Sequence, residues 1–351
     1  MPNSLRIPKP LAPRSHIRII SPGLPTLAHM PDRVRRADRA LRNLGFELSY
    51  GAHAFSISED GITAGTAEER AADFMEAFED GSVDAILASD SGLGSREMIR
   101  FLDASRIAAN AKPFIGYCDT IFLHHYLASE AGVSSLYGCV LMVHFGDGGG
   151  PFPETLEYFE HVLMKSAPLI CRPLRSRAAG NIDWCVPELG GKPRTRDIEG
   201  GWTWLRAGQA RGPLLGAEIS ILPDVICFFN LSLESTVLFW DVAYHGLDVQ
   251  PLFKEVCDRV DLTRLAGMVV GAHPTIPPSE WASEVNKLLW ELLPGTEFPV
   301  LVNADLSHLQ PPWIVPYGEE VILDDAQGVV FPRRAPAVRR LVSAQSGRRS
   351  I

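Results

Sequence analysis

Residues 112–130 read KPFIGYCDTIFLHHYLASE, and this stretch decides the fold class of the 351-residue chain. Its first part is a short apolar run, which predicts a buried strand over 112–117. A helix is predicted to follow at once over 120–130 and to end near Gly132. Earlier parts of the chain repeat this pattern, with strands predicted over 17–20 and 83–88 and helices over 31–44, 68–78 and 95–102. Alternating strands and helices predict a mostly parallel sheet with flanking helices, an α/β fold.

The remainder of the chain predicts a connector and a second, strand-rich part. Glycines and prolines divide residues 146–200 into short segments, which is typical of long loops. Strand-like runs follow at 214–222, 236–242, 268–270, 300–302 and 320–323, with a single helix over 279–293. The predicted organisation is an α/β domain over 1–145, a connector over 146–200, a β-rich domain over 201–332 and a basic tail over 333–351.

Composition excludes several classes of function. The chain is 46% hydrophobic and 21% charged, and it carries a formal net charge of −9. This acidic balance argues against a nucleic-acid partner, because neutralising phosphates requires clustered Lys and Arg. There is no apolar stretch near the ~20 residues of a membrane span and no signal-like N-terminus, so we expect no membrane partner and a cytoplasmic location. The six cysteines show no metal-ligand spacing, so no metal site is predicted.

The junction between the strand over 112–117 and the helix over 120–130 carries a cysteine, Cys118. A helix N-terminus presents unpaired N–H groups and a partial positive charge, so a thiol placed there ionises more readily and becomes a nucleophile. The alternative is that Cys118 is a small buried hydrophobic residue, the usual role of a free cysteine.

Two other segments could contribute to catalysis. Residues 89–95, SDSGLGS, follow a predicted strand, and the backbone N–H of Gly92 could face an oxyanion; the alternative is a tight turn. His308 follows a late strand and could be a general base, and Asp241 ends another strand and could be its acid. A structural histidine and a turn or capping carboxylate are the alternatives.

In their order along the chain, these segments resemble the LD-carboxypeptidase family, especially its microcin immunity branch. The resemblance covers about residues 15–330. It rests on Ile19-Ile20-Ser21-Pro22-Gly23, on 90–95, on Gly116-Tyr117-Cys118-Asp119-Thr120, on Tyr137-Gly138, on 201–205, on 212–217 and on the spacing from His308 to Pro316-Tyr317-Gly318.

This resemblance implies an N-terminal Rossmann-like domain, a β-rich, barrel-like C-terminal domain and an active site between them. Family members use a Ser-Glu-His triad without metal or cofactor, cleave a C-terminal amide in murein tetrapeptides or peptidyl-nucleotide antibiotics, and are commonly homodimers. By motif position, Cys118 would be the nucleophile, His308 the base and Asp241 the acid, with the backbone N–H groups of Gly92 and Asp119 forming the oxyanion hole.

The resemblance also suggests residues that contact the substrate. Trp184 lies in the connector stretch from which a tryptophan of the immunity branch stacks on a nucleobase; interdomain packing is the alternative for it. Ser91 and Tyr117 flank the predicted oxyanion hole and nucleophile, and we expect both to contact the substrate.

The chain departs from the family pattern at the nucleophile and at the acid. Cys118 replaces serine, Asp241 replaces glutamate and Ala217 replaces glycine. A Cys–His pair depends less on the third group than a Ser–His pair, so the first two changes are chemically compatible. The sequence therefore predicts a cysteine-nucleophile acyl-transfer enzyme that acts on a small peptide or amide through a thioester at Cys118. Two alternatives stay open: an amide-forming transferase or cyclase, and a non-catalytic immunity protein that sequesters its ligand.

Overall fold

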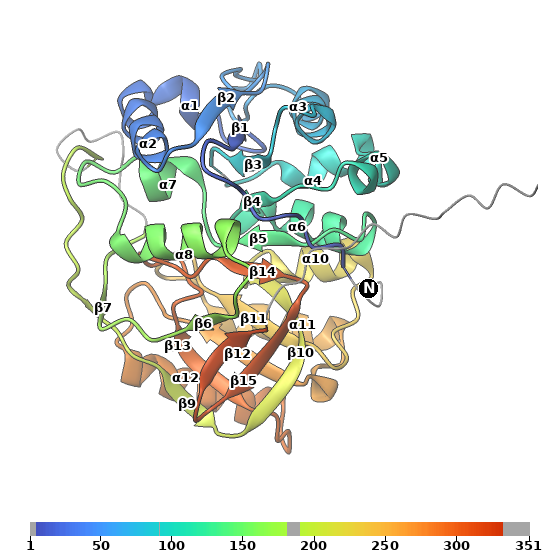
Figure 1. The fold of residues 1–351 in the computed structure, drawn as a ribbon. Helices are drawn as coiled ribbons and strands as arrows, with labels where there is room; N and C mark the ends of the chain where they lie inside the picture. Colours follow the sequence, from blue (N-terminus) through green and yellow to red (C-terminus); the bar gives the residue numbers. More distant parts are fainter. Residues whose placement is uncertain (1–4, 91, 181–189, 333–351) are drawn as a thin grey trace, which may run out of the picture.

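Two β-sheets with their own helices lie one above the other in the computed structural model, which describes residues 5–90, 92–180 and 190–332 (Figure 1). The upper sheet in this view comes mainly from the N-terminal half of the chain and the lower sheet from the C-terminal half. This arrangement confirms the predicted fold class, an α/β domain followed by a β-rich domain. No helix within these ranges is both long enough and apolar enough to cross a membrane.

The first sheet carries the predicted strand–helix alternation. Its strands are β1 (His16–Ile20), β2 (Glu47–Tyr50), β3 (Ala85–Ala88), β4 (Phe114–Gly116), β5 (Ser135–Tyr137) and β14 (Val315–Tyr317). They pair in the order β14-β5-β4-β3-β1-β2, and all pairs are parallel except that of β14 with β5. Its helices are α1 (Thr26–His29), α2 (Pro31–Asn43), α3 (Ala67–Glu79), α4 (Ser95–Met98), α5 (Ala104–Ala109), α6 (Ile121–Ser129) and α7 (Leu141–Phe145), with 3-10 turns η1 (Ile99–Phe101) and η2 (Cys118–Thr120).

Local sequence explains where these helices begin. Pro31 occupies the first turn of α2, where its missing N–H has no cost. At the start of α3, the Thr66 hydroxyl accepts a hydrogen bond from the N–H of Glu69, and the Glu69 carboxylate accepts one from the N–H of Thr66. This capping box satisfies two backbone donors at once. The helix predicted over 95–102 divides into α4 and η1.

The second sheet contains a parallel centre that the sequence only partly revealed. Its strands are β6 (Leu169–Cys171), β9 (Thr203–Arg206), β10 (Gln209–Glu218), β11 (Val237–Asp241), β12 (Gly267–Gly271), β13 (Val300–Ala304), β15 (Glu320–Asp324) and β16 (Gly328–Phe331). They pair in the order β6-β16-β15-β10-β11-β12-β13-β9. The neighbours from β10 to β13 are parallel, and the outer pairs are antiparallel.

The prediction of a single helix in this part was wrong. Besides α12 (Pro278–Leu292), the structure has α10 (Leu222–Phe229), α11 (Val249–Arg259) and the 3-10 turn η3 (Leu262–Arg264). α10 is eight residues long and mostly apolar, with Asp224 as its one charged residue, so its sequence hardly distinguishes a short helix from a buried strand. The strand expected over 214–222 ends at Glu218 for the same reason, since Leu222 already belongs to α10.

The segment predicted as a connector also contains regular structure. α8 (Pro153–Met164) packs against the N-terminal domain, where Phe159 contacts Phe46 and Phe145, and β6 adds a strand to the second sheet. β7 (Ser176–Arg177) and β8 (Ile198–Glu199) form a small antiparallel pair. β14 returns from the C-terminal part of the chain to the edge of the first sheet, so the two sheets exchange segments.

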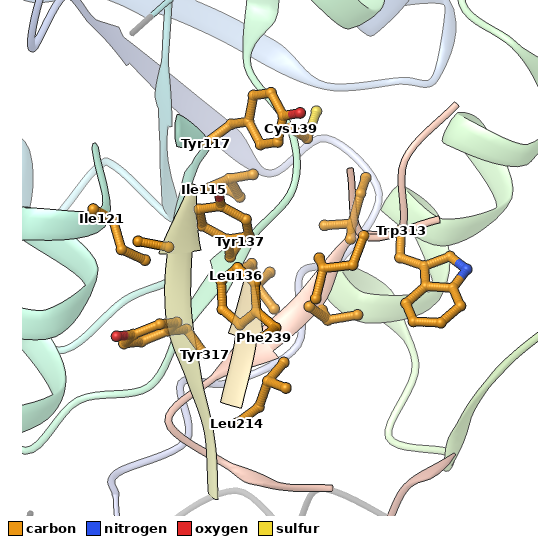
Figure 2. Close-up of a cluster of buried hydrophobic side chains, with 14 of the residues drawn as sticks. Ile115, Tyr117, Ile121, Leu136, Tyr137, Cys139, Leu214, Phe239, Trp313 and Tyr317 are labelled. Carbon is orange, nitrogen blue, oxygen red and sulfur yellow. The ribbon is translucent and has the colours of Figure 1, made fainter. Parts of the chain in front are cut away.

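A cluster of buried side chains joins the two sheets (Figure 2). Tyr137 at the end of β5 packs against Phe239 of β11, with ring centroids 5.1 Å apart. Tyr317 of β14 contacts the same ring of Phe239, at 6.4 Å. The interface beneath the site is therefore an apolar core, which fixes the position of β4 relative to β11.

Candidate active site

Cys118 lies at the sharp turn between β4 and η2. Its backbone is left-handed, with φ of 55°, a conformation that costs free energy in a residue with a side chain. Its backbone N–H donates a hydrogen bond of 3.2 Å to the hydroxyl of Tyr137. The side chain is only partly buried. A strained residue between a strand and a helix, with its side chain accessible, has the geometry of a nucleophile elbow.

His308 and Asp241 meet beside this turn. Asp241 is the last residue of β11, and His308 lies in the loop after β13. Nδ1 of His308 is 2.5 Å from Oδ2 of Asp241, and both residues are buried. Burial by itself lowers the pKa of His308, but the negative charges of Asp241 and Cys118 outweigh it and raise this pKa well above its ordinary value. The environment of His308 therefore favours the imidazolium form of its ring.

The second ring nitrogen of His308 is the one available to Cys118. Nε2 is buried and has no partner within strict hydrogen-bond geometry among the described residues. Cys118 is its neighbour, and the sulfur is close enough for both its charge and a side-chain hydrogen bond to raise the pKa of His308. Hydrogen bonds between catalytic groups are often long in the free enzyme and tighten with substrate. The order in space is thus Asp241, His308, Cys118.

Tyr117 contacts the loop that carries His308. It is buried, and its hydroxyl donates a 2.7 Å hydrogen bond to the backbone carbonyl of Ser307. Its ring lies against the ring of His308, with centroids 4.6 Å apart, and Figure 2 shows Tyr117 next to Tyr137 in the interdomain cluster. This placement favours a positioning role over the predicted contact with substrate.

The two residues expected to form the oxyanion hole lie on neighbouring turns. Gly92 has φ of 92°, a conformation that favours glycine, and an added Cβ would lie 2.5 Å from Cδ1 of Leu24, whose side chain would have to move. The N–H of Asp119 is near the start of η2, where backbone donors lack acceptors within the helix. The Asp119 carboxylate accepts a 2.9 Å hydrogen bond from the N–H of Ser95, and the Asp119 carbonyl accepts one from the Ser95 hydroxyl. These bonds tie the two turns together.

Two residues near the site were not assigned a role from the sequence. Glu218 ends β10 directly opposite Asp241 in the sheet register, and it is buried. Burial and the neighbouring charge of Asp241 raise the pKa of the Glu218 carboxyl. Tyr137 accepts the hydrogen bond from the N–H of Cys118. A polar residue at the carboxyl end of a parallel strand is the signal that could have identified Glu218.

A buried ion pair anchors the loop that carries His308. Nε of Arg177 is 2.6 Å from Oδ1 of Asp305, and both side chains are almost completely buried. Arg177 also donates to the backbone carbonyl of Asn303, at 2.6 Å. Asp305 accepts hydrogen bonds from the N–H of Leu174 and from Nε1 of Trp202, both at 3.2 Å. The loop after β13 is therefore fixed from the side of β7.

Two further residues were predicted to contact the substrate. Ser91 and Trp184 lie outside the described residues. No group of three or more His, Cys, Asp or Glu side chains in the described ranges could hold a metal ion.

Comparisons with known proteins agree with this architecture. The family model for the LD-carboxypeptidase N-terminal domain matches residues 17–138, and the model for the C-terminal domain matches residues 211–323. The microcin C7 self-immunity protein MccF of Escherichia coli is 24% identical over 320 residues, which are 90% of this chain and 92% of that protein. The probable murein peptide carboxypeptidase of Bacillus subtilis is 24% identical over 324 residues, 91% of this chain and 92% of that protein.

Solved structures share the fold as well. The MccF-like protein of Bacillus anthracis superposes with a TM-score of 0.80 at 20% identity, covering 93% of this chain and 99% of that chain. MccF in complex with aspartyl sulfamoyl adenosine gives a TM-score of 0.80 at 24% identity, covering 94% of this chain and 99% of that chain.

Proposed function

This chain belongs to the LD-carboxypeptidase family, and we propose that it is a hydrolase that cleaves an amide bond of a small peptide-like substrate with the thiol of Cys118. The observation that carries the proposal is the hydrogen bond of 2.5 Å between Asp241 and His308, next to a cysteine on a strained strand-to-helix turn. A nucleophile, a base and a group that orients the base are the three parts of a catalytic triad.

The first half of the reaction forms a thioester. Nε2 of His308 takes the proton of the Cys118 thiol, and Asp241 stabilises the resulting imidazolium through Nδ1–H. Sγ attacks the carbonyl carbon, so a C–S bond forms and the carbonyl oxygen becomes an oxyanion. The backbone N–H groups of Asp119 and Gly92 are proposed to donate hydrogen bonds to that oxyanion. His308 then gives its proton to the leaving amine as the C–N bond breaks.

The second half returns the free thiol. His308 takes a proton from a water molecule, whose oxygen attacks the thioester carbon. The C–S bond breaks, the acid is released, and Cys118 recovers its proton from His308. The raised pKa of His308 suits this cycle, because it favours the imidazolium that forms when His308 takes up the thiol proton. An aspartate in place of the family's glutamate still reaches Nδ1, so the shorter side chain preserves the contact.

The substrate class is proposed from the relatives. Relatives include a murein tetrapeptide carboxypeptidase of Pseudomonas aeruginosa, and MccF is described in complex with aspartyl sulfamoyl adenosine. A murein tetrapeptide and aspartyl sulfamoyl adenosine both join an amino acid to a larger polar group through a carbonyl. We propose a substrate of this general kind, with the scissile carbonyl at Cys118. A homodimer, common in the family, stays a prediction.

Product analysis in ¹⁸O-labelled water tests the proposal. The purified protein is incubated with a murein tetrapeptide or with aspartyl sulfamoyl adenosine, and the products are identified by mass spectrometry. Hydrolysis predicts one ¹⁸O atom in the newly formed carboxylate, and the variants below test whether it requires the thiol of Cys118. Cys118→Ala should lose turnover with either compound, whereas Cys227→Ala, which changes an exposed cysteine, should keep it. Retention of most turnover by Cys118→Ala would contradict the mechanism.

The same experiment separates the alternatives that the sequence left open. An amide product that contains an added amine, formed in place of free acid, would identify a transferase. Tight binding of a compound, with neither turnover nor a covalent adduct, would identify a sequestering protein.

A further inference from the structure

A cavity lies at the carboxyl edge of the parallel strands of the second sheet, and none of the proposed catalytic residues lines it. Its volume is about 340 Å³, which is within the range of small-molecule sites. Its walls come from the loop after β11, the loop after β12 and the exposed side of α12. The lining residues used below are His273, Trp281, Asp248, Glu284, Lys287 and Glu291. Ligands of open α/β sheets gather at this edge, beyond the carboxyl ends of the strands.

His273 gives this cavity a fixed hydrogen-bond donor. The residue is only 5% exposed, and its ring lies against that of Trp281 in a tilted arrangement, with centroids 4.8 Å apart. Nδ1 accepts hydrogen bonds from the backbone N–H groups of Thr275, at 3.2 Å, and Ile276, at 3.0 Å. Because Nδ1 is an acceptor, the proton of the neutral ring is on Nε2.

Among residues 5–90, 92–180 and 190–332, the hydrogen bonds of His273 all involve Nδ1, which leaves Nε2 open to the cavity that the ring lines. Burial lowers the pKa of His273 to about 4, so the ring is neutral near pH 7 and Nε2 is a donor only. A nearly buried ring that lines a cavity with an unused N–H is arranged to bind an acceptor atom of a ligand.

The rim of the cavity is acidic. Asp248, Glu284 and Glu291 contribute three carboxylates against one cation, Lys287. Lys287 is 3.9 Å from Glu291, and Gln250 also donates to Glu291 at 3.1 Å, so that carboxylate is already engaged. Asp248 caps α11 by accepting from the N–H of Gln250. Glu284 is exposed and adds charge to the rim, so the cavity attracts cations.

We propose that this cavity is a binding site for a small organic cation that also carries a hydrogen-bond acceptor. The acceptor contacts Nε2–H of His273, the ligand's apolar part lies along Trp281 and Leu288, and the cationic end lies at Glu284. The proposal is independent of the reaction at Cys118, because none of these residues belongs to the proposed triad.

A series of three small-molecule probes tests the contact with His273 and the contact with Glu284, using the full-length chain. N-acetylcadaverine carries an amide carbonyl, an apolar spacer and an ammonium group. Pentylamine lacks the acceptor, and N-acetyl-6-aminohexanoate replaces the cation by an anion. Binding is followed by NMR through the indole N–H of Trp281. We expect saturable binding of N-acetylcadaverine with a dissociation constant of about 1 mM or below. Pentylamine should bind about ten-fold more weakly, and the anionic probe should not bind.

Variants assign the contacts. Glu284→Gln removes an exposed charge and should weaken N-acetylcadaverine about five-fold, whereas the matched change Glu280→Gln, outside the cavity in the same helix, should have no effect. His273→Asn keeps an acceptor near the position of Nδ1 for the turn and removes the Nε2 donor. It should therefore abolish the preference for N-acetylcadaverine over pentylamine.

Three results would overturn the site. They are the lack of a saturable change at Trp281 with N-acetylcadaverine, equal binding of the anionic probe, and equal weakening by Glu280→Gln and Glu284→Gln. Because Glu284 is exposed, its variant keeps the test valid even if His273→Asn fails to fold.

Discussion

Nδ1 of His308 lies 2.5 Å from Oδ2 of Asp241, although the two residues are 67 positions apart in the chain. They meet because β11 and β13 are parallel strands on either side of β12, so their carboxyl ends reach the same edge of the sheet. The first sheet brings Cys118 to this edge from the opposite side. The proposed triad is therefore assembled across the interface between the two sheets.

Protein stability should depend on pH through this pair. The pKa of His308 is raised in the folded state above the value of about 6.5 of an unfolded histidine. A raised pKa stabilises the fold fully below about pH 6.5, and this contribution is lost as the pH rises through the folded-state pKa. Urea unfolding should thus show that the stability advantage of the native protein over Asp241→Asn is largest in mild acid and shrinks toward alkaline pH. An advantage that grew with pH would show the opposite linkage.

Tyr117→Phe should impair catalysis with little change in fold. The variant keeps the ring against His308 but loses the hydrogen bond to the carbonyl of Ser307, at a cost of about 1 kcal/mol. The looser His308 loop should lower kcat several-fold with a smaller effect on KM. Tyr126→Phe is the control, because it removes a similar 3.1 Å bond to the carbonyl of Leu102 on the far side of α6. Equal loss of kcat in both variants would argue against positioning by Tyr117.

Gly271→Ala should disturb the acid of the triad. A Cβ at this position would lie 2.5 Å from Cβ of Asp241 and 2.6 Å from the carbonyl oxygen of Leu306, so the backbone on both sides must move. Overpacking of this kind costs about 1–3 kcal/mol, and it should also reduce kcat because Asp241 shifts relative to His308. Gly81→Ala introduces a Cβ with no neighbour within 4 Å and should leave activity unchanged. Thermal unfolding and kinetics of the two variants provide the comparison.

Arg177→Met should destabilise the protein by about 3–5 kcal/mol, because it leaves the Asp305 carboxylate buried without its partner. The exposed pair of Arg211 and Glu320 gives a matched control, and Arg211→Met should leave the free energy of unfolding nearly unchanged. Denaturant titration measures both. Similar values for the two variants would mean that Asp305 is not an essential anchor.

The sequence predicted those parts of the structure whose local pattern is distinctive. The strand ending before Cys118, the helix after it and the early strand–helix units follow from apolar runs and turn residues, and the structure confirms them. α10 and α8 were missed. α10 is short and mostly apolar, and α8 lies in a stretch whose flanking glycines and prolines suggested loops. Local periodicity cannot resolve such cases, because tertiary packing decides them.

The sequence predicted which residues form the candidate site, but it did not predict how they are arranged in space. Cys118, His308 and Asp241 were placed together through family motifs, and the structure brings Asp241 and His308 into contact next to Cys118. The support from Arg177 and the position of Glu218 opposite Asp241 depend on the strand register, which the sequence alone does not specify. The catalytic roles themselves stay predictions.

Selective alkylation is the most direct test of whether Cys118 is a reactive nucleophile. The protein is treated briefly with iodoacetamide at pH 7, its intact mass is measured, and the modified cysteine is mapped by peptide analysis. Cys139 and Cys171 are buried, so the main competitor among the described cysteines is exposed Cys227, whose sulfur contacts the guanidinium of Arg259.

A first single adduct is expected at Cys118, lost in Cys118→Ala and slowed in His308→Gln, because glutamine cannot accept the thiol proton. Modification of Cys227 while Cys118 stays unmodified would contradict it.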